Sequence, residues 1–279
     1  TVRVLPDGTI RLGPAVLDPR GRLRSVGGMT VRGPEACVWR APTDNDEGHG
    51  PLDYWHEAPT MENLGAGAGR PGPSSADRWR SARLHLARSR HLGTTVGADG
   101  SVLVRERVGA RSMAGSVEVT TRLREVAGGL AIGVDLVPAG DLPAVLPRLG
   151  VRLGVPGGDW QVTWRGSGPG LSYPDLTGAA RRGTFRASVA GMWEETVRPQ
   201  ESGTRLGLQH LEMADGDRCL ALDVTGEEPA FSLSPWDLGA LTRADHVEEL
   251  VEDDVVWLNL EAIVDGIGCR SCGSDVSNG

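Results

Sequence analysis

The chain has 279 residues, 39% hydrophobic and 24% charged, which is enough apolar content for one large domain or two smaller ones. Its formal net charge of -8 argues against a nucleic-acid-binding surface. No apolar run reaches the ~20 residues that a membrane helix needs, and no signal peptide is visible, so we expect a cytoplasmic protein.

The first part of the chain is predicted to contain short strands and then a long loop. Turn signals at Asp7-Gly8 and Pro19-Arg20-Gly21 separate apolar stretches in residues 1–40. Residues 41–78 are predicted to be loop-like, and the Gly, Pro and Ser of residues 65–76 are typical of a flexible insertion. We interpret this insertion as a surface loop of one domain rather than a domain boundary.

The least generic stretch is Trp39-Arg40-Ala41-Pro42-Thr43-Asp44-Asn45-Asp46-Glu47-Gly48. Pro42 favours extended backbone before it, so Trp39 and Arg40 are predicted to end a strand. The acidic and amide side chains at 44–46 suit turns because they bond nearby backbone amides. Such a loop can also offer oxygen atoms to sugar hydroxyls or a cation. On residue chemistry alone, a polar hairpin loop and a binding loop both stay open.

From Trp79 onward, apolar residues alternate with polar ones, which is typical of half-buried strands. This pattern predicts strands around Leu84-His85-Leu86, 117–123, 130–136, 160–164 and 220–224. Turns every 8 to 15 residues favour a β-sandwich or barrel. The only predicted helix spans residues 235–250, with Ser234 as its cap and Pro235 in its first turn.

The distinctive stretch resembles the W-R-A-P-T-D-N-D-x-G signature of the small-chain, C-terminal domain of glycoside hydrolase family 2 β-galactosidases. Weaker echoes follow in the order of that family. They are Gly168-Pro169 with Tyr173-Pro174-Asp175, then Pro199 to Arg205, Phe231 to Pro235 with Leu241 and His246, Trp257 to Leu260, Gly266-Ile267-Gly268, and Ser271-Cys272-Gly273.

The resemblance implies an all-β, antiparallel supersandwich of the galactose mutarotase-like type with one short helix. Residues 1–279 would be one such domain, truncated at both ends of the parent chain. The parent would be a retaining β-galactosidase that hydrolyses terminal β-D-galactosides. Its two glutamates would lie on a catalytic TIM barrel. These residues show no βα alternation, so no catalytic residue is predicted in this chain.

The family sends two elements of this domain to the substrate mouth, and both map onto this sequence. One is the loop after the signature, which assigns Asp44, Asn45, Asp46, Gly48 and His49 to substrate binding. The other is a stretch near the end of the chain, where some members place a tryptophan and this sequence has Cys272. The resemblance also implies a β-galactoside substrate, a homo-oligomer, and Mg and Na held mostly by residues outside this chain.

Several positions depart from the family pattern. Leu171 replaces a glutamate, Leu176 an arginine, Glu261 an aspartate and Ser274 a proline. The family also continues through a further strand or two beyond this point, so we expect a fragment or a diverged member.

Other kinds of site find little support in the residues. Asp44-x-Asp46-x-Gly48 lacks the glycine and glutamate of an EF-hand, and four cysteines with one close pair form no zinc pattern. Gly166-x-Gly168-x-Gly170 is not a dinucleotide fingerprint. No metal ligand and no bound cofactor are therefore predicted for this chain, and its cysteines are expected to be free thiols.

Three alternative functions stay open. A stand-alone carbohydrate-binding module would need an exposed aromatic platform, for which Trp39 and Trp55 lie near the loop. A mutarotase-like epimerase would need a histidine and a carboxylate in one cleft, and the nominated pair is His210 with Glu201 or Glu212. A purely structural, sugar-blind domain is also open.

Glu201 and Arg205 are expected to form an internal ion pair, or else to bind substrate.

Overall fold

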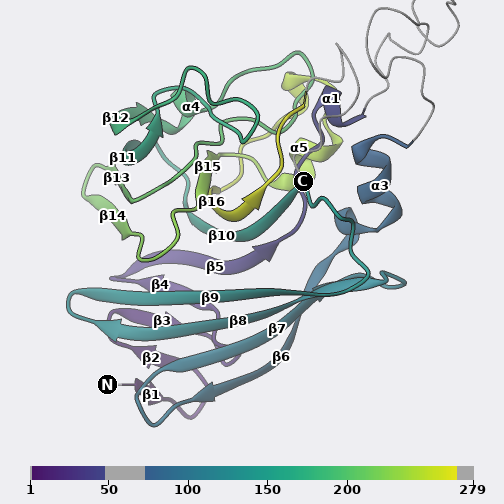
Figure 1. Ribbon diagram of the computed structural model, residues 1–279. Coiled ribbons are helices and arrows are strands. Elements are labelled where there is room, and N and C mark those ends of the chain that lie inside the picture. The colour runs from purple at the N-terminus through teal and green to yellow at the C-terminus, as the bar shows by residue number, and fades with distance from the viewer. Residues whose placement is uncertain (1, 48–72, 269–279) are drawn as a thin grey trace, which may run out of the picture.

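Antiparallel β-strands make up most of the computed structural model, which describes residues 2–47 and 73–268 (Figure 1). The all-β, antiparallel class predicted from the alternating pattern is confirmed, whereas its assignment to the galactose mutarotase-like supersandwich stays a prediction. In the described ranges, no helix is long and apolar enough to cross a membrane.

Among the described residues, the largest sheet has eight strands. Its spatial order is β1-β2-β3-β4-β5-β10-β16-β15. The strands are β1 (Val2–Val4), β2 (Ile10–Leu12), β3 (Ala15–Leu17), β4 (Leu23–Val26), β5 (Met29–Cys37), β10 (Arg148–Pro156), β16 (Val255–Val264) and β15 (Ala230–Ser234). Strands from both ends of the sequence therefore meet at β5, β10 and β16. The first and last signature segments follow β5 and β16, which lie on either side of β10.

Two four-stranded sheets cover this long sheet. The first has the order β6-β7-β8-β9, from β6 (Arg88–Val96), β7 (Val102–Gly109), β8 (Gly115–Val126) and β9 (Gly129–Gly140). The second has the order β12-β11-β13-β14, from β12 (Arg181–Ser188), β11 (Gln161–Gly168), β13 (His210–Asp215) and β14 (Arg218–Asp223).

Both smaller sheets lie on the same face of the long sheet. Leu153 of β10 packs in a core with Val102, Val104 and Leu123 of the first small sheet. Val155, two residues further along β10, packs in a separate core that contains Trp160 and Trp164. Residues two apart on a strand point to the same face, so one face of β10 serves both cores.

Short helices lie in the connections, and here several predictions were wrong. The single helix expected over 235–250 is only α5 (Leu238–Arg243), followed by the 3-10 turn η2 (Val247–Glu249). Asp237 caps it, because the Ser234 hydroxyl instead accepts a hydrogen bond from the Trp236 amide in a preceding turn. The C-cap Ala244 is extended, which ends the helix.

Three further short helices among the described residues contradict the expectation of one. They are α1 (Asp44–Glu47), α3 (Ser75–Ser81) and α4 (Val189–Met192). Ser74 and Asp77 form a capping box at the start of α3, inside the stretch predicted to be a loop. The strand expected at residues 84–86 is the 3-10 turn η1 (Leu84–Leu86), which follows a left-handed Arg83.

Gly150 on β10 tests how tightly the central strands pack. A Cβ atom there would clash with the backbone oxygen of Leu260 and lie 2.7 Å from Glu261 Cα. We expect Gly150→Ala to lower the free energy of unfolding by about 3 kcal/mol, because backbone atoms cannot move aside cheaply. Urea denaturation measures this loss. Gly133→Ala on β9 is the matched control, since nothing lies within 4 Å of its Cβ position. Equal stabilities for the two variants would contradict this packing.

Candidate functional site

The signature segment is folded around a buried ion pair between Arg40 and Asp46. The Arg40 side chain is fully buried and donates from Nε to Asp46 Oδ2 (3.1 Å) and from Nη2 to Oδ1 (2.7 Å). Thr43 closes the turn, because its amide donates to Asp46 Oδ2 and its hydroxyl accepts from the Asp46 amide. Burial lowers the pKa of Arg40, but nearby carboxylates, Asp46 first and then Glu201, outweigh this effect and raise it. Burial also raises the pKa of Asp46, although Arg40 and Thr43 oppose the shift.

Arg40 and Asn45 together hold four consecutive backbone carbonyls from the other end of the chain. Arg40 donates from Nη1 to the oxygen of Asp265 and from Nη2 to that of Gly266, each at 2.7 Å. The Asn45 amide donates to the oxygens of Ile267 (3.0 Å) and Gly268 (2.8 Å). Two side chains of the signature therefore fix the course of residues 265–268.

Asp175 holds the same segment from its amide side. Its carboxylate accepts from the backbone amides of Ile267 (3.1 Å) and Gly268 (2.7 Å). Asp175 lies in a tight turn, since Tyr173 and Leu176 exchange backbone hydrogen bonds. We call Arg40, Asn45, Asp46 and Asp175, with the segment 265–268 that they hold, the clamp. It joins three of the motifs picked out in the sequence.

A second buried network adjoins the clamp and is centred on Arg148. Its Nη2 donates to both carboxylate oxygens of Glu201 (2.9 and 2.8 Å) and lies 2.9 Å from Glu261 Oε1. The backbone amide of Glu201 donates to the oxygen of Ala41, which connects this network to the signature. Burial raises the pKa of Glu261 to about 7, opposed by Arg148.

The expected ion pair between Glu201 and Arg205 is wrong. Glu201 pairs with Arg148, whereas Arg205 donates to the backbone oxygens of Pro169, Met192 and Gly203. The Arg205 guanidinium also lies over the Trp164 ring, 5.1 Å from its centroid. A carboxylate and an arginine four residues apart need not meet in irregular backbone, where no helix brings them onto one face.

A hollow of about 610 Å³ opens beside the clamp. Asn45, Asp46, Asp175 and Asp265 line one part of it. The other part is formed by α3 and the turn that follows β9, with Arg78 and Trp79 on the α3 side. Burial raises the pKa of Asp265 to about 6, although Arg40 opposes the shift. The polar side chains of the clamp thus face this hollow next to Gly268. We therefore take it as the candidate site.

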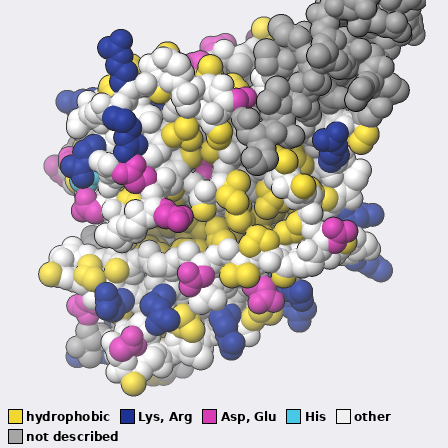
Figure 2. Space-filling view, viewed as in Figure 1, with side chains coloured by type: hydrophobic (Ala, Val, Ile, Leu, Met, Phe, Trp, Pro, Cys, Tyr) yellow, Lys and Arg dark blue, Asp and Glu magenta, His cyan; other side chains and the backbone are white. Residues whose placement is uncertain are grey.

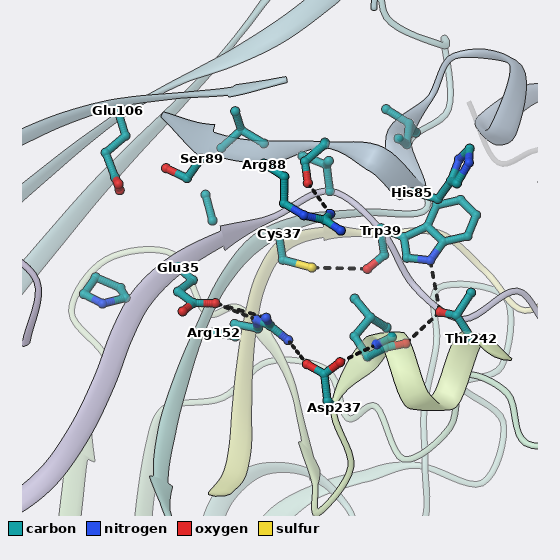
Figure 3. Close-up of a pocket in the computed structure, with 18 of the residues that line it drawn as sticks. Glu35, Cys37, Trp39, His85, Arg88, Ser89, Glu106, Arg152, Asp237 and Thr242 are labelled. Carbon is teal, nitrogen blue, oxygen red and sulfur yellow. Dashed lines mark hydrogen bonds and ion pairs between the residues drawn. The ribbon is translucent and has the colours of Figure 1, made fainter. Parts of the chain in front are cut away.

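A second hollow, of about 580 Å³, lies between β5, β7 and α5 and is less suited to a ligand (Figure 3). The charged groups that line it are largely paired with one another. Arg152 bridges Glu35 and Asp237, and Arg22 pairs with Glu106. Trp39 reaches this hollow with its ring nitrogen bonded to Thr242. The indole is buried and packs against Trp79 and His85, which leaves little surface for stacking a sugar.

The residues predicted to bind substrate fall into three groups. Asn45 and Asp46 line the candidate site, but the Asp46 carboxylate is occupied by Arg40 and Thr43. Asp44 points elsewhere, since its carboxylate accepts from Arg198 and Gln200. Gly48, His49 and Cys272, as well as Trp55, lie outside the described residues. Contact with a sugar stays a prediction for all of them.

Three residues that build the site were not predicted from the sequence. Arg40 and Asp175 stood inside quoted motifs but were assigned no role, and Asp265 was not singled out. The available signal for Arg40 was its place inside the signature, next to the X-Pro break. Asp175 and Asp265 had no such signal, because only the pairing of distant strands brings them to the site.

Other candidate chemistry finds no support in the part of the chain that the structure describes. No group of three or more His, Cys, Asp or Glu residues there could hold a metal ion. Cys37 and Cys219 are free thiols. His210 bonds to Asp223 on the neighbouring strand, while Glu201 is committed to Arg148, so that nominated epimerase pair is not brought together.

Comparison with known proteins places these features in a family. A family model described as "Beta galactosidase small chain" matches residues 18–278. The chain belongs to this family. The family of the resemblance, carried by the signature and its echoes, is therefore confirmed.

Individual relatives agree with this assignment. A protein named beta-galactosidase from Arthrobacter sp. (strain B7) is 35% identical over 272 residues, which cover 96% of this chain and 26% of that protein. Similarly named proteins from Photobacterium profundum and Lactobacillus delbrueckii subsp. bulgaricus are 29% and 27% identical, over 85% and 84% of this chain and 21% of each relative. The chain thus spans about a quarter of the length of these relatives.

Two aspartates of the signature give a matched test of the clamp. We expect Asp46→Asn to lower the free energy of unfolding by about 3–5 kcal/mol, because it leaves the Arg40 charge buried without a counter-ion. Asp44→Asn removes an exposed ion pair with Arg198 and alters a long contact with Gln200, and it should change the free energy of unfolding by less than about 1 kcal/mol. Urea denaturation of both variants measures the difference. Losses of equal size would show that the buried pair does not organise the segment.

Asp265 makes stability depend on pH. Its pKa is about 6 in the folded protein against 3.8 when exposed, so its contribution is fully present below pH 4 and is lost as pH rises through 6. Asp265→Asn keeps the acceptor for Gly266 but cannot ionise. Relative to the wild type, this variant should gain about 1 kcal/mol of stability between pH 4 and pH 8, after allowance for partial exposure. A difference that is constant over this range would contradict the assignment.

Proposed function

We propose that this chain is the accessory domain of a β-galactosidase that hydrolyses terminal β-D-galactosides with retention, as in glycoside hydrolase family 2. Its role is to complete the substrate mouth and to pack on a catalytic TIM barrel carried by the rest of the protein. Membership of the small-chain family and the names of the longer relatives support the enzyme. The clamp supports the role at the mouth.

The single observation that carries the proposal is the position of Asn45. Its backbone lies in α1, three residues before the stretch that begins at Gly48, and its side chain holds Ile267 and Gly268, three residues before Ser271 and four before Cys272. The hydrogen bonds of Asn45 to Ile267 and Gly268 thus join the two stretches of chain that lead to the expected mouth elements. In this proposal, the clamp presents both to the sugar in a fixed relative position, which reduces the entropy that binding must supply.

The chemistry itself belongs to carboxylates elsewhere in the protein. Retaining glycosidases need one carboxylate as nucleophile and one as acid/base. The carboxylates of Asp46, Asp175 and Glu201 are bound to arginines or backbone amides, and Glu261 is buried beside Arg148, so these groups are poorly placed to act on a sugar. We therefore propose that residues 1–279 alone do not hydrolyse galactosides. The homo-oligomer, the Mg and Na of the parent enzyme and the cytoplasmic location stay predictions.

Asn45 provides the test, in the natural polypeptide that contains residues 1–279. We expect Asn45→Ala to raise KM for a chromogenic β-galactoside about 3–10-fold with a smaller change in kcat, because the mouth is loosened while the catalytic carboxylates are untouched. The matched control is Asn259→Ala, which loses a buried amide bonded to Ser232 away from the candidate site. The control should leave KM within about twofold of the wild type.

Two results would contradict the proposed function. One is hydrolysis of the galactoside by residues 1–279 alone, at a rate comparable with the longer polypeptide. The other is an unchanged KM in Asn45→Ala when the variant is folded. In either case the clamp would be a purely structural feature of the domain.

A further inference from the structure

One acidic side chain of the Arg148 network is unlike the others. Figure 2 shows Asp and Glu side chains on one face of the molecule, where water can solvate their charge. Glu261 on β16 differs, because only 1% of its side chain is exposed. Neither of its carboxylate oxygens is hydrogen-bonded to a described residue. A buried carboxyl group without such bonds is costly in its charged form.

Glu261 shares its counter-ion with Glu201. Arg148 Nη2 lies 2.9 Å from Glu261 Oε1, and it also donates to both carboxylate oxygens of Glu201, at 2.9 and 2.8 Å. Glu201 Oε1 accepts two further hydrogen bonds, from the hydroxyls of Thr204 (3.1 Å) and Tyr173 (3.3 Å). Glu201 is therefore satisfied as an anion and takes up the charge of Arg148. Glu261 has only a contact with the same nitrogen atom.

No second counter-ion is available to Glu261 among the described residues. The titratable and charged groups around it are Arg148 with the nearby Cys37, together with Arg40, Tyr173 and Glu201. Arg40 is committed to Asp46 by two hydrogen bonds, and burial raises the pKa of the Tyr173 hydroxyl, which stays neutral. Strand β15, on the other side of β16, has no titratable side chain. Two buried arginines thus face three buried carboxyl groups, which leaves one negative charge unbalanced.

We propose that the Arg148 network binds one proton, on the carboxyl group of Glu261, and that the fold around it is held most firmly in this protonated state. Protonation removes the unbalanced charge without any change of packing. The network is joined to the signature by the hydrogen bond from the Glu201 amide to the Ala41 oxygen. Loss of the proton therefore weakens a contact that supports the clamp. The inference stands independently of the proposed function.

The electrostatics of the network give the pH range of this effect. Burial raises the pKa of Glu261 from 4.5 to about 7, and the charge of Glu201 acts in the same direction, whereas Arg148 and Arg40 oppose the shift. The folded protein therefore holds the proton more tightly than the unfolded chain does. The stabilisation is fully present below pH 4.5 and is lost as pH rises through 7. The network is thus expected to respond to pH near neutrality.

Amide hydrogen exchange, followed by mass spectrometry in the natural polypeptide that contains residues 1–279, tests the proposal. The measured quantity is the protection of peptides around Glu201 and Glu261 relative to peptides from β8 of the same molecule, so that the intrinsic pH dependence of exchange cancels. This relative protection should fall about 10-fold between pH 6 and pH 8, because local opening lets Glu261 ionise at its ordinary pKa. A relative protection that does not change with pH would overturn the proposal.

A pair of variants identifies the group that holds the proton. Glu261→Gln keeps the shape of the side chain but cannot ionise, so its relative protection should stay constant between pH 6 and pH 8. Glu212→Gln changes an exposed carboxylate on β13 and should retain the fall seen in the wild type. If Glu261→Gln does not fold, the wild-type measurement above still decides the matter. A folded Glu261→Gln variant that keeps the fall would overturn the assignment of the proton to Glu261.

Glu201→Gln tests the shared counter-ion. The glutamine oxygen can still accept from the hydroxyls of Thr204 and Tyr173, but the competing charge is removed and Arg148 is left to Glu261. Glu261 should then lose its proton at a lower pH, and the fall in relative protection should move below pH 6. A fall that remains between pH 6 and pH 8 in a folded Glu201→Gln variant would contradict competition for one arginine.

Discussion

The structure depends on one buried arginine. Arg40 has no exposed surface, and a buried guanidinium is tolerated only when its donors are satisfied and its charge is balanced. Asp46 balances the charge with two hydrogen bonds, and the carbonyls of Asp265 and Gly266 accept two more. The Trp79 ring lies 5.2 Å from the guanidinium carbon. These partners come from different stretches of the chain, so satisfying Arg40 requires those stretches to meet.

This requirement explains why motifs far apart in the sequence share one region of the fold. Strands β5, β10 and β16 are neighbours in the long sheet, which brings residue 40, residue 148 and residues 261–268 together before any side chain is considered. The polar networks then fix the irregular segments that leave these strands. Arg148 with Glu201 and Glu261 forms the buried network next to the clamp. Asn45 and Asp175 fix the segment 265–268, where the chain leaves β16. The sheet provides the scaffold, and the buried ion pairs determine where its loops go.

The alternation of apolar residues was sufficient to predict the all-β class, because period-2 patterning reports directly on half-buried strands. The pattern failed for Leu84-His85-Leu86, where three residues are too few to distinguish a strand from a 3-10 turn. Capping residues predicted a helix over 235–250 with Ser234 as its cap, but the Ser234 hydroxyl caps a turn instead. The motifs indicated the family, but not that Arg40 and Asn45 hold residues 265–268. Those contacts join residues more than 200 positions apart and depend on strand order, which local patterns do not encode.

In the proposed function, Asn45 and Asp175 hold the same segment, at Ile267 and Gly268, and thereby shape the substrate mouth of a larger enzyme. A double-mutant cycle in the natural polypeptide tests this directly, with kcat/KM for a β-galactoside measured for Asn45→Ala, Asp175→Ala and the double variant. If both residues position the same segment, the double variant should lose about as much as the worse single variant. Losses that multiply, or single variants with no loss at all, would contradict the account.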